Sequence, residues 1–276
     1  MWGGGLVIAK RGLADTSLAL FGFIRAGSAL LFVIAFGLLT TGFSIATPKL
    51  LIVAVLGGTL DSFGGTLLHM IALKRSPAHE AVPLSNTAPF WGVVAAVVFL
   101  GESPQFTSFA AAVLVVLGAY FLASNHDRSD KQTTRWGPWV ALAAGVLWGV
   151  AEIVPAKHCL THGMTPLTYQ LMALTGSATA WGVFALFRYC LGGFPWSRKG
   201  MSIATFTGFT NLFLGSVLWL FALDRAPANL IAPIRGLVVL FGFLASVLIL
   251  KERPSKRSAI GVLLIIAGVM LVSIAW

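Results

Sequence analysis

The sequence predicts an all-α polytopic membrane protein with ten transmembrane helices, the first one truncated, built as two inverted five-helix repeats. Composition is the first observation: of 276 residues, 57% are hydrophobic and only 10% are charged, whereas soluble domains carry about a quarter charged residues. The apolar residues also form runs of about 20, the length that crosses a hydrocarbon core as a helix. Finally, the two halves of the chain repeat each other.

The predicted helices follow from apolar windows of about 18 residues or more. They lie at 18–40, 50–73, 81–100, 106–124, 139–160, 166–188, 201–223, 228–250 and 258–275. A further apolar segment, 2–13, has only about half the spanning length. Its Trp2-Gly3 near Lys10 resembles Trp148-Gly149 near Lys157 in the later part of 139–160. We therefore expect 2–13 to be a first helix that lacks roughly its first ten residues.

The repeat is defined by positions that apolar composition alone would not align. A shift of 150 positions matches charged residues, glycines and prolines without a gap: Lys49 with Lys199, Gly58 with Gly208, Gly65 with Gly215, Arg75 with Arg225, Pro83 with Pro233, Glu102 with Glu252 and Gly118 with Gly268. We expect a first repeat at 1–124, a linker at 125–138 and a second repeat at 139–276. Because five is an odd number, the second copy enters from the opposite side, which is the inverted-repeat plan of many secondary transporters.

The net charge of +10 does not indicate nucleic-acid binding, because Lys and Arg lie in short clusters between the apolar runs. That pattern is typical of membrane orientation by positive charge. Cys159 and Cys190 suggest neither a disulfide scaffold nor a metal site. The sequence contains no phosphate-binding loop and no hydrolase or zinc motif. We expect no catalytic residues, no cofactor and no metal.

Four segments carry a family resemblance. They are Ala72–Ala78 with its copy Ala222–Ala228, and Gly101–Pro104 with its counterpart Lys251–Pro254. In these motifs the sequence resembles the drug/metabolite transporter superfamily, in its ten-helix EamA-like branch. The resemblance implies that helices one to four and six to nine surround a central cavity, with the fifth and tenth at the periphery. It does not fix the substrate, because the branch includes amino-acid exporters, nucleotide-precursor carriers and sugar-type carriers.

Polar residues inside the predicted spans are the candidate site. An ionisable group in a bilayer core costs at least about 2.5–3.5 kcal/mol, so it usually faces a cavity or a partner. The mid-helix tryptophans Trp91, Trp148 and Trp181 are expected either to line the same cavity or, with at least equal weight, to pack against lipid or a helix. The candidate substrate-binding residues are Arg25, Asp61, Asn86, Trp91, Trp148, Glu152, Gln170, Asn211 and Arg235. A possible proton relay comprises Asp61, His69 and Glu152, and the alternative for His69 is a satisfied helix-interface residue.

Helix geometry suggests which candidates meet. Asp61 and its repeat counterpart Asn211 lie at the centres of 50–73 and 201–223, where they form a binding pair or make interhelical hydrogen bonds. Arg235 and Glu152 lie about 6 and 4 Å from the midplane on the same side, so they could pair, as a structural ion pair or as a substrate or proton site. Arg25 could reach Asp61, or bind a carboxylate or phosphate.

Three further expectations concern local structure and orientation. Glu102 and Glu252 are expected to cap the helices that they precede, and Pro89 and Pro155 are expected to kink their helices. The loops after the odd-numbered helices hold nearly all the loop Lys and Arg, so the positive-inside rule places both termini outside the cytoplasm. The resemblance implies the opposite, because better-known relatives usually have cytoplasmic termini.

These patterns predict a secondary transporter that exports amino acids or similar small metabolites by alternating access. The alternatives are a flippase for a lipid-linked substrate, an importer of a small anionic metabolite, and a non-transporting scaffold. The predicted location is the plasma membrane, the inner membrane of a bacterium, crossed many times. The predicted partners are a small-molecule substrate and the lipid bilayer but no nucleic acid, with the protein as a monomer or homodimer.

Overall fold

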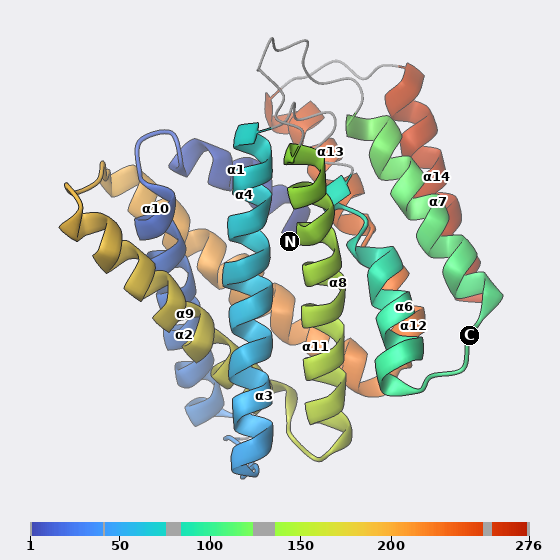
Figure 1. Ribbon diagram of the computed structural model, residues 1–276, viewed down its shortest axis with the longest axis horizontal. Coiled ribbons are helices and arrows are strands. Elements are labelled where there is room, and N and C mark those ends of the chain that lie inside the picture. Colours follow the sequence, from blue (N-terminus) through green and yellow to red (C-terminus); the bar gives the residue numbers. More distant parts are fainter. Residues whose placement is uncertain (1, 41, 76–83, 124–135, 251–255, 275–276) are drawn as a thin grey trace. The chain divides into compact units, whose positions relative to one another are not determined.

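The computed structural model of the protein describes residues 2–40, 42–75, 84–123, 136–250 and 256–274 (Figure 1). These residues form helices and connecting turns, with no strand in any described range. The helices are α1 (Trp2–Gly12), α2 (Leu18–Leu39), α3 (Pro48–Gly58), η1 (Thr59–Gly65), α4 (Thr66–Arg75), α6 (Ala88–Leu100), α7 (Phe106–Ala123), α8 (Gly137–Thr161), α9 (Pro166–Cys190), α10 (Arg198–Thr207), η2 (Gly208–Gly215), α11 (Ser216–Arg225), α12 (Ala228–Ile234), α13 (Leu237–Leu250) and α14 (Lys256–Ile274).

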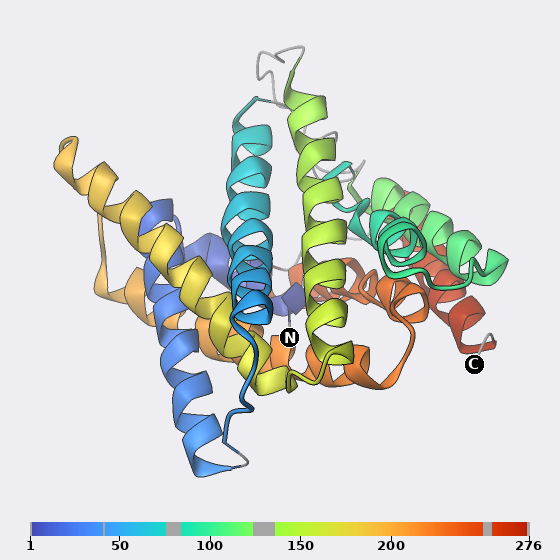
Figure 2. The same ribbon diagram turned by 60° about the horizontal axis from the view of Figure 1, so that its bottom comes forward.

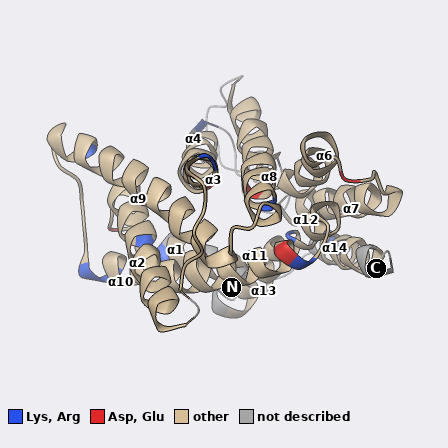
Figure 3. Cartoon of the chain, turned by 90° about the horizontal axis from the view of Figure 1, so that it is seen from below, with Lys and Arg blue, Asp and Glu red and all other residues tan. Residues whose placement is uncertain are grey.

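Many of these helices are long enough to span a membrane. Within the described ranges, six helical segments are long and apolar enough to cross a membrane, and three shorter apolar helices accompany them. With α1, they follow the predicted order of ten helices, so the predicted fold class is confirmed. Figure 3 agrees with the composition, because acidic and basic positions take up little of the ribbon and most of the helical length is uncharged.

Two spanning segments contain a π-helical stretch in their middle. The segment from Pro48 to Arg75 is α-helical except at η1, and the segment from Arg198 to Arg225 is α-helical except at η2. The two stretches are repeat counterparts, separated by the same offset of 150 positions as the sequence repeat. π-helices are rare and are frequently found at functional sites. Their recurrence shows that both repeats have the same local distortion.

The ninth predicted helix, 228–250, is interrupted. It divides into α12 and α13, with Arg235 and Gly236 in the turn between them. Pro233 lies in the last turn of α12, where its missing N–H and its ring oppose continuation of the helix. The predicted span is therefore present, with Ala228–Ala245 apolar enough to cross a membrane, but it consists of two helices and not of one.

The fourth predicted helix also differs. Residues 81–83 lie outside the described residues, and α6 begins only at Ala88, after a turn at Asn86 and Thr87. Pro89 belongs to the first turn of α6, where a proline is tolerated because its N–H would be unpaired anyway. The predicted kink at Pro89 is therefore wrong. Pro155 does lie inside a helix, because α8 continues through it to Thr161.

The chain divides into two compact units, and each takes segments from both halves of the sequence. The first unit comprises 1–63 and 155–225, and the second comprises 64–154 and 226–276. In the first unit, α9 packs against α2 and α3, and η2 packs against α2 (Figures 1 and 2). The core of this unit consists of small and medium apolar side chains: Ala29, Val33, Leu167, Leu174, Phe213 and Val217.

In the second unit, α7 and α14 lie side by side along much of their length (Figure 1). Glycine permits this approach: a Cβ added to Gly118 would lie 2.6 Å from the Gly261 carbonyl oxygen, and one added to Gly261 would lie 2.7 Å from the Gly118 oxygen. In the same unit, α6 also packs against α12. Small residues at helix contacts are typical of membrane proteins, where packing rather than hydrophobic burial joins the helices.

Candidate substrate-binding site

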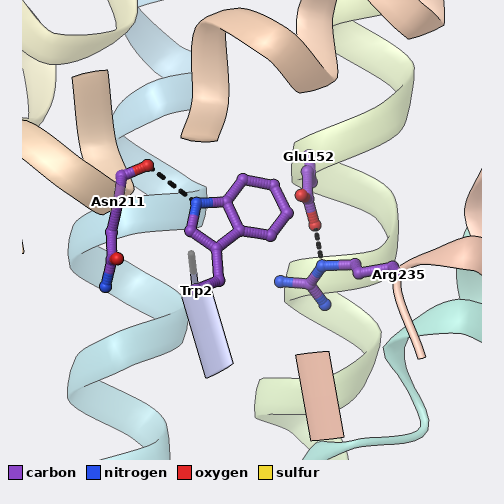
Figure 4. Close-up of polar contacts among 4 residues, drawn as sticks. All are labelled: Trp2, Glu152, Asn211 and Arg235. Atoms are coloured by element: carbon purple, nitrogen blue, oxygen red, sulfur yellow. Dashed lines mark hydrogen bonds and ion pairs between the residues drawn. The ribbon is translucent and has the colours of Figure 1, made fainter. Parts of the chain in front are cut away.

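The second unit contains an ion pair between two spanning segments. Arg235, in the break between α12 and α13, pairs through Nε with the Glu152 carboxylate of α8 (Figure 4). The estimated depths of Arg235 and Glu152 in their helices had allowed this pair. Its side chains are 21% and 10% exposed, respectively. The paired Nε and Oε2 atoms are buried, and only other parts of the two side chains are exposed. Each charge therefore needs the other.

Aromatic rings surround this pair. The guanidinium carbon of Arg235 lies 5.8 Å from the ring centre of Trp148, within the range of a cation–π interaction. Trp148 and Glu152 are four residues apart on α8, so their side chains project from the same face. Arg235 therefore contacts a ring and a carboxylate of one helix face at once. This arrangement fixes the position of the guanidinium.

His69 of α4 extends the same cluster. Its ring centre lies 5.2 Å from that of Trp148, and its Nδ1 is 2.9 Å from the Ser85 hydroxyl oxygen. Gly65 makes room for the indole, because a Cβ there would come within 2.3 Å of the Trp148 ring. Charged, aromatic and hydroxyl groups thus come together in the second unit from α4, α8 and the α12–α13 break.

Asn86 and Trp91 lie near the start of α6. Asn86 is in the turn before the helix, and the Trp91 indole donates a hydrogen bond to the Thr87 hydroxyl at 3.1 Å. The α8 backbone packs here, since a Cβ on Gly149 would lie 2.6 Å from the Trp91 Cβ. The Trp91 indole N–H is therefore used within the first turn of its own helix.

Glu102 fixes the start of the broken helix. Its two carboxylate oxygens accept the backbone N–H groups of Ala228 and Asn229, at 2.7 and 2.8 Å, and the Asn229 amide donates to the Ser103 carbonyl at 2.9 Å. The prediction that Glu102 caps the helix it precedes was wrong. It caps α12 instead, because Pro227 offers that helix no side-chain cap. Glu252 lies outside the described residues.

The first unit holds the other central carboxylate. Asp61 lies in η1 and interacts electrostatically with Arg25 of α2. The Arg25 Nε is buried and has no hydrogen-bond partner among the described residues. Asp61 is therefore near enough to Arg25 to act on its charge, and a direct contact between the two side chains stays a prediction.

Asn211 and Gln170 are almost fully buried, with exposed fractions of 1% and 5%. The Thr210 hydroxyl donates to Asn211 Oδ1 at 3.3 Å, and the Trp2 indole N–H donates to the Asn211 carbonyl at 2.7 Å (Figure 4). The Gln170 amide donates to the Leu212 carbonyl at 2.6 Å. In this conformation both residues contribute to helix packing around η2. Their place in a binding site remains a proposal.

Three features of these clusters were not predicted: the π-helices, the contact of Trp2 with η2, and the capping of α12 by Glu102. The π-helices had a signal in the sequence. Gly58 and Gly65 border η1, and Gly208 and Gly215 form the two ends of η2, at the repeat offset. The described residues include no group of three His, Cys, Asp or Glu side chains that could hold a metal ion.

Ionisable groups inside spanning helices, a broken helix and an internal repeat together define a polytopic membrane transport protein. The chain belongs to the EamA-like transporter family, whose model matches residues 1–124 and 135–274. Transporters of this family are generally not enzymes.

Three relatives are similar to this chain in sequence, and one solved structure is similar to it in fold. Two uncharacterized transporters of Archaeoglobus fulgidus are 23% identical over 98% of this chain and 93% of their own length, and 30% identical over 75% and 72%, respectively. A probable terminal-alkyne amino-acid exporter of Streptantibioticus cattleyicolor is 29% identical over 71% of this chain and 64% of its own. A crystal structure with 17% identity covers 99% of this chain and 93% of its own with a TM-score of 0.82, which shows the fold.

Proposed function

We propose that the protein is a secondary transporter that exports amino acids or similar small metabolites across the plasma membrane, which in a bacterium is the inner membrane. The observation that carries the proposal is a spanning helix interrupted at an ion-paired arginine, Arg235. Discontinuous spanning helices form the binding sites of many secondary transporters. The turn at Asn86 supports this interpretation, because Asn86 is the repeat counterpart of Gly236.

Alternating access follows from the repeat. Two inverted copies can exchange conformations and expose one site to each side in turn. The π-helices η1 and η2 support this mechanism, because they place a deformable stretch at the middle of two corresponding helices. The amino-acid class and the outward direction are supported by the exporter relative, with 29% identity. Arg25 and Arg235 would also suit an anionic substrate, so an importer of a small anionic metabolite is the alternative.

One observation favours a second candidate, a flippase for a lipid-linked substrate. An apolar groove of about 750 Å³ lies between α2 and α9, where Phe23, Leu31 and Val183 are among its lining residues. Its hydroxyl groups are satisfied by backbone carbonyls: Ser28 donates to Arg25 and Thr179 donates to Thr175. The groove therefore offers an alkyl surface, which suits a lipid tail. Export of water-soluble substrates remains our main proposal, because both polar clusters contain arginine.

The test is transport in proteoliposomes loaded with a mixture of amino acids, with efflux measured by mass spectrometry. We expect efflux of at least one amino acid above protein-free liposomes, and a loss of about tenfold or more in Arg235→Gln, because the guanidinium contact made with substrate is removed. Arg225→Gln is the matched control, since Arg225 is exposed at the end of α11. Wild-type efflux equal to protein-free liposomes, or equal efflux in both variants, contradicts the proposal.

A further inference from the structure

Resting on the proposed function, we infer that the Arg235–Glu152 pair is a split receptor for a zwitterionic α-amino acid. The Arg235 guanidinium receives the substrate carboxylate, and the Glu152 carboxylate receives the substrate ammonium group. In the structure described here the two side chains neutralise each other. Substrate binding separates them, and each then pairs with the opposite charge of the zwitterion.

Charge balance selects the substrate class. A buried charge that loses its partner is strongly destabilised, whereas a charge that exchanges one partner for another is not. A zwitterion supplies one partner to each member of the pair. An anionic metabolite would supply a partner to Arg235 only, and it would bring a second negative charge close to Glu152. A cationic amine would leave Arg235 unpaired in the same way.

The surroundings allow the pair to open. The Trp148 ring lies 5.8 Å from the Arg235 guanidinium and so holds the arginine when the carboxylate moves away. Because Arg235 lies in a break between helices and not inside one, its backbone can shift without unfolding a spanning helix. The two side chains keep exposed fractions of 21% and 10%, but the paired Nε and Oε2 atoms are themselves buried, so a ligand meets these atoms only when the pair opens.

The same face provides a wall for the amino-acid side chain. His69 and Trp148 stand with their ring centres 5.2 Å apart, and the histidine is held by its Nδ1 contact with the Ser85 hydroxyl. Aromatic rings accept apolar and flat side chains with little demand for hydrogen bonds. This part of the receptor therefore sets the preference among amino acids, while the ion pair sets the preference for the zwitterion.

The experiment measures binding to the full-length protein in detergent by thermal shift, since a ligand of the folded state raises the melting temperature. The probes are amino acids in sets of three: the amino acid, its amide without the negative charge, and its N-acetyl derivative without the positive charge. For the amino acid that stabilises the protein most, we expect about 100-fold weaker binding of both derivatives, the factor that a lost buried charge partner would produce.

Two variants separate a receptor from a purely structural pair. In Glu152→Gln, we expect the zwitterion to bind about tenfold or more weakly, while the N-acetyl derivative binds nearly as well as the zwitterion. In Arg235→Gln, we expect the zwitterion to bind about tenfold or more weakly, while the amide derivative binds nearly as well as the zwitterion. A structural pair predicts an equal loss for all three ligands in both variants. Arg225→Gln serves again as the variant with unchanged binding.

A charge-swapped double variant, Glu152→Arg with Arg235→Glu, covers the case in which a single variant does not fold. It keeps an ion pair but exchanges the positions of the two charges, so the zwitterion would have to bind in the opposite orientation and we expect at least tenfold weaker binding. Unchanged binding in this variant overturns the inference. The inference is also overturned if the wild-type protein binds a derivative as tightly as it binds the corresponding zwitterion. If those results accompany normal efflux from proteoliposomes, the proposed function stands. Absence of efflux overturns the proposed function itself.

Discussion

Gly58 ends α3 where this helix meets α9. A Cβ at this position would lie 2.2 Å from the carbonyl oxygen and 2.3 Å from the Cα of Ala173. Because both contacts are with backbone, a side-chain rotation cannot relieve them. The contact of α3 with α9 in the first unit therefore depends on a residue without a side chain.

We predict that Gly58→Ala lowers the free energy of unfolding by about 1–3 kcal/mol, the usual cost of overpacking a tight contact. The measurement is the melting temperature of the purified protein in detergent. Gly27→Ala is the matched control, because Gly27 lies inside α2 with no atom within 4 Å of an added Cβ. We expect the control to be neutral or slightly stabilising, since alanine favours a helix more than glycine does. Equal melting temperatures for the two variants would show that α3 and α9 adapt without cost.

Single residues were predictable where helix geometry alone fixes their depth. Arg235 and Glu152 were placed on one side of the midplane by a rise of about 1.5 Å per residue, and the structure pairs them. The approach of Arg25 to Asp61 followed from the same calculation. The burial of Asn211 did not, because it depends on Trp2, which lies 209 positions away in sequence.

At the level of elements, α12 depends on a residue outside its own sequence. It has 7 residues and starts after Pro227, which provides no side-chain cap. Two N–H groups at its start are bound by Glu102. The carboxylate also lies at the positive end of the helix dipole, where a negative charge is stabilising. Because α12 ends at Ile234, directly before Arg235, Glu102 also helps to position the arginine of the candidate site.

We predict that Glu102→Ala lowers the free energy of unfolding by about 0.5–2 kcal/mol, the usual cost of losing a helix cap. Glu102→Gln should lower the free energy of unfolding by only part of this amount, because its neutral amide oxygen still accepts hydrogen bonds, although weaker ones. Thermal unfolding measures both. The control is Ser103→Ala, since Asn229 binds the backbone carbonyl of Ser103 and not its hydroxyl group. A Glu102→Ala protein that unfolds with wild-type stability would contradict the assigned cap.

The helix interruptions show where hydropathy fails as a predictor. An apolar window reports length and composition, and both stay the same whether 228–250 forms one helix or two. The break depends on the local chemistry of Pro233 and Gly236, and the π-helices depend on one additional residue in a turn. The sequence repeat does pair Gly58 with Gly208 and Gly65 with Gly215, and these glycines lie at or next to the ends of the two π-helices.

At the scale of the whole molecule, orientation in the membrane is set by charge. The loops after the odd-numbered helices hold nearly all the loop Lys and Arg, so the positive-inside rule predicts that these loops lie in the cytoplasm. The two ends of α9 offer positions at which this prediction can be tested. Its start is bound to the loop that follows α2, through hydrogen bonds between Thr165 and Ser44, and its end is at Cys190. These two points lie at opposite ends of one spanning helix, about 37 Å apart.

The native cysteines make this orientation measurable. Cys190 is exposed, whereas Cys159 is buried and its thiol is 3.6 Å from the Leu50 carbonyl oxygen. We predict that a membrane-impermeant maleimide labels Cys190 in inside-out vesicles but not in intact cells, because the loop after Cys190 leads to the basic residues Arg198 and Lys199 at the start of α10. The matched control is Ile45→Cys in a Cys190→Ser background: Ile45 is fully exposed at the other end of α9, so labelling should reverse. Labelling of Cys190 from outside the cell would instead give the opposite topology, with the loops richest in Lys and Arg outside the cytoplasm.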